Sequence, residues 1–335
     1  MGEQTWSEFE IIDRFFSTIQ GHLPGEVIAG IGDDAAILTP DKDAPLLVTH
    51  DMMVEDVHFR GTWMPPDTLA RKLVKVNISD IAAMGGIPQF GILSLALPDF
   101  MEKGWLEAFS DGLKGVFQEY NLFLIGGDTS RSPGPVVVAL TLLGKGGNGF
   151  PVLRHHPKAG ETLFVTGTLG DSSLGMKILN RKGTNSLTED EAYLVKRHLD
   201  PTPRVSAGRE IASRHLASTM IDISDGLIAD LGHLLEGTSL GAEIQVESLP
   251  LSQEFKRVAS KLNDTPETLA LAGGEDYELL FTSSISPDAF TLSSPTPKIT
   301  PIGHITETPG IRVLKHGTPL TLETGGFQHR FHQKG

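Results

Sequence analysis

Residues 220–227, MIDISDGL, decide the fold class, because an apolar run passes directly into acidic residues and a glycine. A helical pattern at 227–235 follows. A second stretch of the same design, LFLIGGD, lies at 122–128 in the first half of the chain. Short apolar runs bounded by turn residues predict buried strands. Strands that alternate with helices are typical of mixed folds.

Similar elements recur on both sides of these two stretches. Further strands are predicted at 46–48, 90–97, 136–143 and 163–165, and helices at 69–81, 105–120, 174–179 and 208–217. This interleaving indicates an α/β or α+β class. The glycine-rich segment 144–151 is the best candidate for a domain boundary. We therefore expect an N-terminal domain at 1–146 and a C-terminal α/β domain at 147–335.

The composition excludes several classes of protein. The 335 residues contain 28 Lys plus Arg and 42 Asp plus Glu, a formal net charge of −14. Such a chain lacks the cations that nucleic acid or an anionic membrane surface requires. It has no Cys, which excludes disulfides, iron–sulfur clusters and thiolate zinc sites. With no membrane-spanning apolar run and no secretory pattern, we expect a cytoplasmic protein.

Aspartates beside predicted strands and glycines carry the functional signal. They are Asp33, Asp34, Asp51, Asp128, Asp222 and Asp225. Carboxylates gathered at strand ends suit Mg²⁺, which prefers oxygen ligands. Two unit charges about 4 Å apart repel by about 4 kcal/mol at an effective dielectric near 20, so converging acids need cations or raised pKa values. Acids that do not converge are ordinary turn formers and helix caps, and for any single one this alternative stays open.

Asp80 differs because it lies inside a predicted helix. Leu73, Asn77, Asp80 and Met84 follow the spacing of one helix face. The outer two members are apolar, so this face should point inward. A buried and unpaired Asp costs several kcal/mol, and Asp80 therefore needs a partner. That partner is a backbone cap, a Lys or a metal ion.

Two glycine-containing loops give weaker signals. The segment GTLGDS at 167–172 can present backbone N–H groups to a phosphate, or it can be a plain strand–helix connection. The chain contains no Walker or dinucleotide-binding motif. The segment GGEDYELL at 273–280 fits a cation or hydroxyl site and fits a polar turn before a strand equally well. For His58 and Arg154 the pattern alone favours ordinary structural and surface roles.

Taken in order, the motifs resemble the thiamine-monophosphate kinase family, of the superfamily that includes aminoimidazole ribonucleotide synthetase. They are GIGDDAA at 30–36, VTHD at 48–51, VHF at 57–59, NISDIAAMG at 77–85, GGDT at 126–129, TGTLGDS at 166–172, DISDGL at 222–227 and GGEDYEL at 273–279. The resemblance covers nearly the whole chain. It implies a two-domain aminoimidazole ribonucleotide synthetase-like fold, whose N-terminal domain binds ATP and pairs in a homodimer.

The resemblance also implies an activity and its residues. The γ-phosphoryl group of the co-substrate ATP would pass directly, in line, to thiamine monophosphate, giving thiamine diphosphate. Several Mg²⁺ ions would assist, and no general base is needed because the accepting phosphate oxygen is already ionised. The implied metal ligands are Asp34, Thr49, Asp51, Asp80, Asp128, Asp222 and Asp225. The implied ATP contacts are Gly127, Arg154 and Ser224, and the implied thiamine contacts are His58, Glu275 and Phe327.

Two positions depart from the family pattern. His50 stands where a small hydroxyl residue is usual, and it is left out of the ligand set because imidazole is softer than oxygen. Asp56 stands where glycine is common. The absence of Cys argues against the selenophosphate synthetase and hydrogenase-maturation relatives. The remaining alternatives are a catalytically silent nucleotide- or thiamine-binding protein and another ATP-dependent enzyme of the superfamily.

Overall fold

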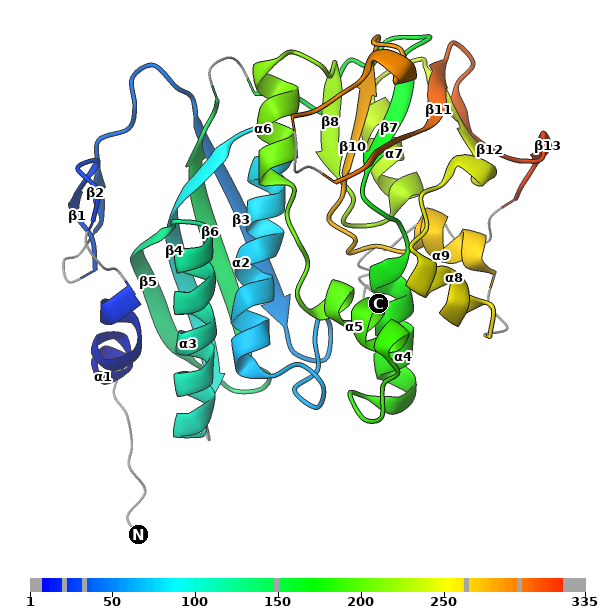
Figure 1. Ribbon diagram of the computed structural model, residues 1–335. Helices are drawn as coiled ribbons and strands as arrows, with labels where there is room; N and C mark the ends of the chain where they lie inside the picture. The colour runs from blue at the N-terminus through cyan, green and yellow to red at the C-terminus, as the bar shows by residue number, and fades with distance from the viewer. Residues whose placement is uncertain are drawn as a thin grey trace, which may run out of the picture. The chain divides into compact units, whose positions relative to one another are not determined.

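The computed structural model describes residues 8–19, 23–31, 35–99, 101–147, 151–261, 265–293 and 297–321. The chain divides into two compact units (Figure 1). Unit 1 comprises Met1–Ile81 and Gly86–Phe150, and unit 2 comprises Ala82–Gly85 and Pro151–Gly335. The expected boundary after residue 146 remains a prediction, because it adjoins residues outside the described ranges.

Unit 1 contains a four-stranded sheet with the order β3-β6-β4-β5. Its strands are β3 (Leu46–Val54), β4 (Ile87–Pro98), β5 (Phe123–Ser132) and β6 (Val137–Lys145). Strands β4 and β5 run parallel, and the other neighbouring pairs are antiparallel. The remaining elements are β1 (Val27–Ala29), β2 (Ile37–Leu38), α1 (Glu8–Ile11), a π-helical turn (Ile12–Phe16), a 3₁₀ turn (Ser17–Ile19), α2 (Pro66–Ala83) and α3 (Lys103–Glu119).

Helices α2 and α3 cover one face of this sheet (Figure 1). Helix α3 buries Leu106, Phe109, Leu113 and Val116, which recur at helical spacing. Glycines allow the close approach: a Cβ at Gly91 would lie 2.8 Å from the Phe117 ring, and one at Gly112 would lie 2.2 Å from the Asp67 carbonyl oxygen of α2. One face of the sheet is therefore packed under helices, and α2 runs across β3.

Unit 2 contains a seven-stranded sheet with the order β13-β12-β9-β11-β7-β10-β8. Its strands are β7 (Thr162–Thr166), β8 (Thr219–Asp222), β9 (Gly241–Gln245), β10 (Leu279–Ser283), β11 (Ile299–Thr306), β12 (Gly310–Lys315) and β13 (Thr318–Pro319). Its helices are α4 (Asp171–Lys182), α5 (Glu189–Leu199), α6 (Val205–Ser213), α7 (Leu227–Leu235), α8 (Gln253–Ala259) and α9 (Pro266–Ala272), with 3₁₀ turns at Val246–Ser248 and Pro287–Ala289.

Both faces of the second sheet are packed. On one face, Phe164 of β7 and Phe281 of β10 stack against each other and meet Ile211 of α6. On the other face, side chains of β7 and β10 join Leu231 of α7 and Leu271 of α9. Strand β10 lies antiparallel to both β7 and β8. The acidic turns after β8 and before β10 are therefore neighbours.

The predicted mixed, two-domain fold is confirmed. The helix at 227–235 matches α7 from end to end, whereas the helix predicted at 208–217 ends at Ser213, because His215 is left-handed with φ 52°. The apolar runs predicted that Asp51 and Asp128 follow the ends of strands. In the structure both residues lie inside strands, Asp51 in β3 and Asp128 in β5. Polar residues continue a strand when they alternate between its faces. Among the described helices, none is long and apolar enough to cross a membrane.

Candidate active site

Strand β3 and helix α2 bring three of the predicted metal ligands together in unit 1. Thr49 and Asp51 occupy alternate positions of β3 and so share one face. The Thr49 hydroxyl donates a hydrogen bond to the Asp80 carboxylate of α2. The Asp51 N–H donates to the Asn77 side-chain oxygen at 3.2 Å. The helix row predicted from the sequence therefore faces β3, and the partner of Asp80 is a hydroxyl group.

The two carboxylates are poorly compensated. Burial, and then the charge of Asp80, raise the pKa of Asp51 to about 7. Burial also raises the pKa of Asp80, partly offset by the Thr49 hydrogen bond. No Lys or Arg in the described ranges forms an ion pair with either group. Two such acids beside a hydroxyl suit a divalent cation with oxygen ligands.

The pair is an incomplete ligand set. The described residues contain no group of three or more His, Asp or Glu side chains placed to hold one metal ion. Asp34, the other acid predicted near this pair, lies outside the described residues, as does Asp33. The residues present fit a hard cation through two carboxylates and one hydroxyl.

Two further positions of unit 1 lie on the opposite face of the sheet. The His50 ring contacts the Thr141 hydroxyl of β6 at 2.9 Å, and strand alternation turns it away from Thr49 and Asp51. Asp128 shares the row of Ser94 and Ala139, which continues to Met52 and not to Asp51. A Cβ at Gly127 would lie 2.3 Å from the Leu93 carbonyl oxygen, so the backbones meet there. Asp128 and Asp51 therefore do not converge within one sheet.

His58 is oriented by the backbone after β3. Its Nδ1 accepts a hydrogen bond from the Val54 N–H at 3.0 Å, so the neutral ring carries its proton on Nε2. Asp56 in the same loop has φ 64°, in the left-handed region. A glycine would reach that conformation without strain.

In unit 2 the turn after β8 presents three predicted contacts. Asp222 is the last residue of β8, and Ser224 and Asp225 follow before α7. A single oxygen of Asp230 accepts the N–H groups of Ser224, Asp225 and Gly226 at 3.1, 3.1 and 3.0 Å. Burial, and then the charge of Asp225, raise the pKa of Asp230 to about 7. Asp230 thus shapes the turn that carries the predicted ligands.

The turn before β10 docks on the turn after β8. The Glu275 N–H donates to the Ser224 carbonyl at 2.7 Å, and the Tyr277 N–H donates to the Ile223 carbonyl at 2.9 Å. Glu275 and Tyr277 are left-handed, with φ 63° and 51°. A Cβ at Gly274 would lie 2.3 Å from the Ser224 carbonyl oxygen. A predicted ATP contact and a predicted thiamine contact are thus joined through their backbones.

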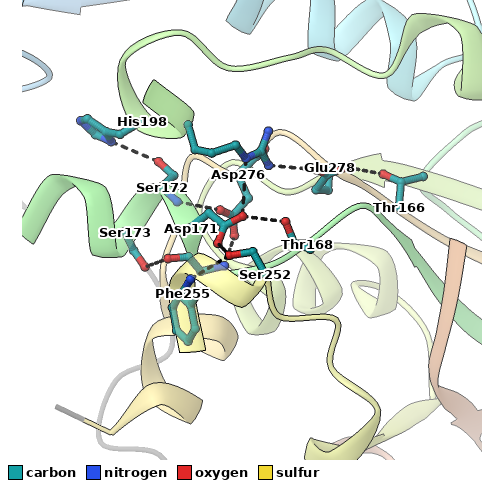
Figure 2. A network of polar contacts seen from close by, with 12 residues as sticks. Thr166, Thr168, Asp171, Ser172, Ser173, His198, Ser252, Phe255, Asp276 and Glu278 are labelled. Atoms are coloured by element: carbon teal, nitrogen blue, oxygen red, sulfur yellow. Dashed lines mark hydrogen bonds and ion pairs between the residues drawn. The ribbon is translucent and has the colours of Figure 1, made fainter. Parts of the chain in front are cut away.

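Two buried acids, Asp276 and Glu278, anchor the turn before β10 to neighbouring elements of unit 2 (Figure 2). Asp276 accepts the N–H groups of Gly170 and Ser172 at 2.6 and 3.1 Å. Glu278 accepts the Thr166 hydroxyl at 2.7 Å, Arg197 at 2.9 Å and the Arg204 Nε at 2.6 Å. Burial raises the pKa of Asp276 to about 7, although Arg197 acts in the opposite direction. Glu278, by contrast, pairs with two guanidinium groups inside the protein.

The same contacts decide the role of the loop at 167–172. Its N–H groups at Gly170 and Ser172 already bind Asp276, so they are not available to a phosphate. The loop is a strand–helix connection sealed by a carboxylate. Arg154 lies exposed near the start of unit 2. Phe327, the predicted aromatic contact, lies outside the described residues.

Comparison with known proteins covers both units. Residues 32–145 match the N-terminal domain of the AIR synthase related proteins, and residues 158–315 match their C-terminal domain. Thiamine-monophosphate kinase of Escherichia coli strain K12 is 39% identical over 329 residues, which cover 96% of this chain and 98% of that protein. The chain belongs to the thiamine-monophosphate kinase family. The family member of Bacillus subtilis strain 168 is 35% identical over 332 residues, covering 96% and 99%.

Solved structures of the thiamine-monophosphate kinase family agree with this fold. The protein from Stenotrophomonas maltophilia K279a has a TM-score of 0.77 and 35% identity, covering 92% of this chain and 96% of its own. AaThiL complexed with AMPPCP and TMP has a TM-score of 0.76 and 32% identity, covering 98% and 100%. The hydrogenase maturation protein HypE in complex with ATP shares the fold, with a TM-score of 0.75 at 16% identity.

The sequence interpretation missed Asp230, Arg197 and Arg204 of this family member's site, and it included Asp276 and Glu278 only as part of the segment 273–280. Asp230, Asp276 and Glu278 organise the two turns of unit 2, and Arg197 and Arg204 neutralise Glu278. A signal existed for Asp230, because it shares a helix face with the buried Leu227, Leu231 and Leu234 and so resembles Asp80 in α2. The two arginines gave no local signal, since their partner is far away in the sequence.

Proposed function

We propose that this protein phosphorylates thiamine monophosphate with ATP and forms thiamine diphosphate and ADP. The observation that carries the proposal is the half-buried pair Asp51 and Asp80, two carboxylates with no Lys or Arg partner among the described residues. The pair lies in a chain that aligns over nearly its full length with thiamine-monophosphate kinases. A site of this charge attracts polyanionic substrates only together with cations.

The protein's part in the reaction is to position and neutralise charge. The acceptor is a phosphate oxygen that is already ionised at pH 7, so no side chain has to remove a proton. We assign Asp34, Thr49, Asp51, Asp80, Asp128, Asp222 and Asp225 to divalent metal binding. Bound Mg²⁺ would supply charge neutralisation for the phosphates. Gly127, Arg154 and Ser224 bind the nucleotide, while His58, Glu275 and Phe327 bind the thiamine end.

The working protein is proposed to be a homodimer. Strand β3 is an edge strand whose outward face exposes Leu46, Val48 and Met52 at 51%, 61% and 52%. Exposed apolar edge strands pair with another chain. Asp128 shares this face, so a second copy bound to the face would bring its own residues close to Asp128.

Light scattering should find a dimer, and Val48→Lys with Met52→Lys should give an inactive monomer. A monomeric but active wild type would refute the dimer.

The deciding experiment incubates the purified protein with Mg-ATP and thiamine monophosphate. We expect thiamine diphosphate and equimolar ADP, with no product when Mg²⁺ is omitted or thiamine replaces its monophosphate. Binding of both substrates without product would instead indicate a silent binding protein. Product from another superfamily substrate would move the activity within the superfamily.

A further inference from the structure

The side chain of Glu275 meets a buried histidine of α5. His198 is 1% exposed, and its Nδ1 lies 3.2 Å from a carboxylate oxygen of Glu275. The same nitrogen lies 3.1 Å from the hydroxyl of Ser172, as Figure 2 shows. Glu275 keeps 30% of its side chain exposed, so it joins the protein interior to the surface of unit 2.

This arrangement is not that of a nucleophilic triad. In a Ser-His-acid triad, the serine and the acid bind different ring nitrogens of the histidine. Here both neighbours share Nδ1, and Ser172 is fully buried at the start of α4. The histidine therefore cannot transfer a proton from the serine while the acid supports its other nitrogen. Its geometry suits holding a carboxylate in place.

The backbone of Glu275 is already fixed by other contacts. Its N–H donates to the Ser224 carbonyl. The carboxylate of the next residue, Asp276, accepts the Gly170 N–H at the start of α4. The left-handed φ of 63° at Glu275 turns its side chain out of the path of a regular strand. What remains variable is the rotamer of a long side chain, which loses considerable entropy when it is held still. His198 supplies a contact that restrains this rotamer.

We infer that His198 is a positioning residue, which sets the direction of the Glu275 carboxylate for the thiamine end of the substrate. The inference rests on the proposed function and deepens it. It predicts that His198 governs the affinity for thiamine monophosphate and leaves the affinity for ATP nearly unchanged. A merely structural histidine would affect both substrates, or only the melting temperature.

The test compares His198→Asn with His198→Gln. The amide of Asn can place an N–H donor near the position of Nδ1, whereas that of Gln reaches the position of Nε2. We expect the Asn variant to keep a KM for thiamine monophosphate close to that of the wild type, because it can retain the hydrogen bond to Glu275. The Gln variant should raise that KM about tenfold or more, with the KM for ATP nearly unchanged, because it loses a hydrogen bond to a charged group. Ser172→Ala removes the other neighbour of Nδ1 and should behave like the Asn variant.

Coupling to Glu275 separates positioning from a general loss of structure. Adding His198→Gln to Glu275→Gln should cost much less than it costs in the wild type, because the partner is already altered. Equal effects of the Asn and Gln variants, or fully additive effects, would overturn the inference. If the Gln variant does not fold, the His198 ring nitrogen resonances decide: they should shift in Glu275→Gln, and an unchanged spectrum would overturn the inference. A wild type without activity on thiamine monophosphate would refute the proposed function instead.

Discussion

The Asp51–Asp80 pair of unit 1 and Glu278 of unit 2 face opposite electrostatic conditions. In unit 1, Asp51 and Asp80 lie beside each other with a hydroxyl group but without a described Lys or Arg partner. In unit 2, the fully buried Glu278 is bound by Arg197, Arg204 and a threonine hydroxyl. The negative charge of the first pair has no cationic partner among the described residues. The charge of Glu278, by contrast, is balanced by arginines of its own chain. Burial of an acid thus marks a ligand site only where the protein leaves the charge uncompensated.

The largest effect is expected from Glu278→Gln. Removing this charge leaves two guanidinium groups without their shared carboxylate, so the free energy of unfolding should fall by about 3–5 kcal/mol. Urea denaturation with and without Mg²⁺ should give the same loss, because the compensation is internal. The matched change Glu236→Gln, at a side chain 71% exposed, should have almost no effect. Equal stabilities of the two variants would remove the contrast between the units.

Asp80→Asn should reverse this pattern. We expect turnover to fall by about 100-fold or more, since loss of a metal ligand should exceed the 10–100-fold cost of altering a group that only supports one. Without Mg²⁺ the variant should be no less stable than the wild type, because one of two repelling acids is gone. Steady-state kinetics and thermal melting check both parts. The exposed Asp111→Asn on α3 is the control, and near-normal turnover in Asp80→Asn would contradict the metal assignment.

Asp51 makes the contrast dependent on pH. Its folded pKa of about 7 lies above the ordinary value of 3.8, so it favours folding at low pH, and this contribution is lost as the pH rises through about 7. The free energy of unfolding of the metal-free protein should therefore fall as the pH rises from 3.8 to about 7, by at most about 1.4 kcal/mol per pH unit. Mg²⁺ competes with the proton, so its affinity should rise up to about pH 7 and then level off.

Melting in EDTA and titration calorimetry with Mg²⁺ would measure both trends for Asp51. The comparison protein is Asp51→Asn, which should lose this pH dependence together with the tight Mg²⁺ binding. An Mg²⁺ affinity that is flat between pH 5.5 and about 7 in the wild type would argue against a protonated Asp51 in the metal-free state.

His50→Thr should have the smallest effect. Its ring contacts Thr141 on the face of the sheet that Asp51 does not share. Turnover and Mg²⁺ dependence should stay within about twofold of the wild type, because the ring points away from Asp51 and threonine keeps a small polar side chain on the face proposed for the dimer. A strong change in metal preference would show that His50 reaches the cation after all, and it would weaken the separation of the two faces.

The sequence predicted what depends on local pattern. The spacing of apolar residues located α2, α3 and α7, and the row from Leu73 to Met84 predicted that Asp80 points inward, which the contact with Thr49 of β3 agrees with. It failed where alternation mattered more than hydrophobicity, since Asp51 and Asp128 continue strands instead of ending them. Nothing local could reveal that these two acids lie on opposite faces, because the order β3-β6-β4-β5 comes from long-range pairing.

The network of unit 2 was hidden for a similar reason. Glu278 lies 74 residues from Arg204 and 112 from Thr166 along the chain. The loop at 167–172 was compatible with phosphate binding because it contains glycines and leads into helix α4. Only the fold shows that the Asp276 carboxylate fills it.

In unit 2, carboxylates accept backbone N–H groups at the start of α4 and in the turn before α7, and this has a consequence for the proposed reaction in a cell. Many phosphate-binding proteins use the amide groups at a helix start to hold the anion directly. Here Asp276 accepts the N–H groups of Gly170 and Ser172 at the start of α4, and Asp230 accepts three N–H groups of the turn that precedes α7. Side chains of the protein already occupy these N–H groups, so on the proposed function bound Mg²⁺ would supply a large part of the affinity for phosphates. Product formation in a cell would then follow the supply of free Mg²⁺, and magnesium starvation would act on this step earlier than on kinases that hold phosphate with their backbone.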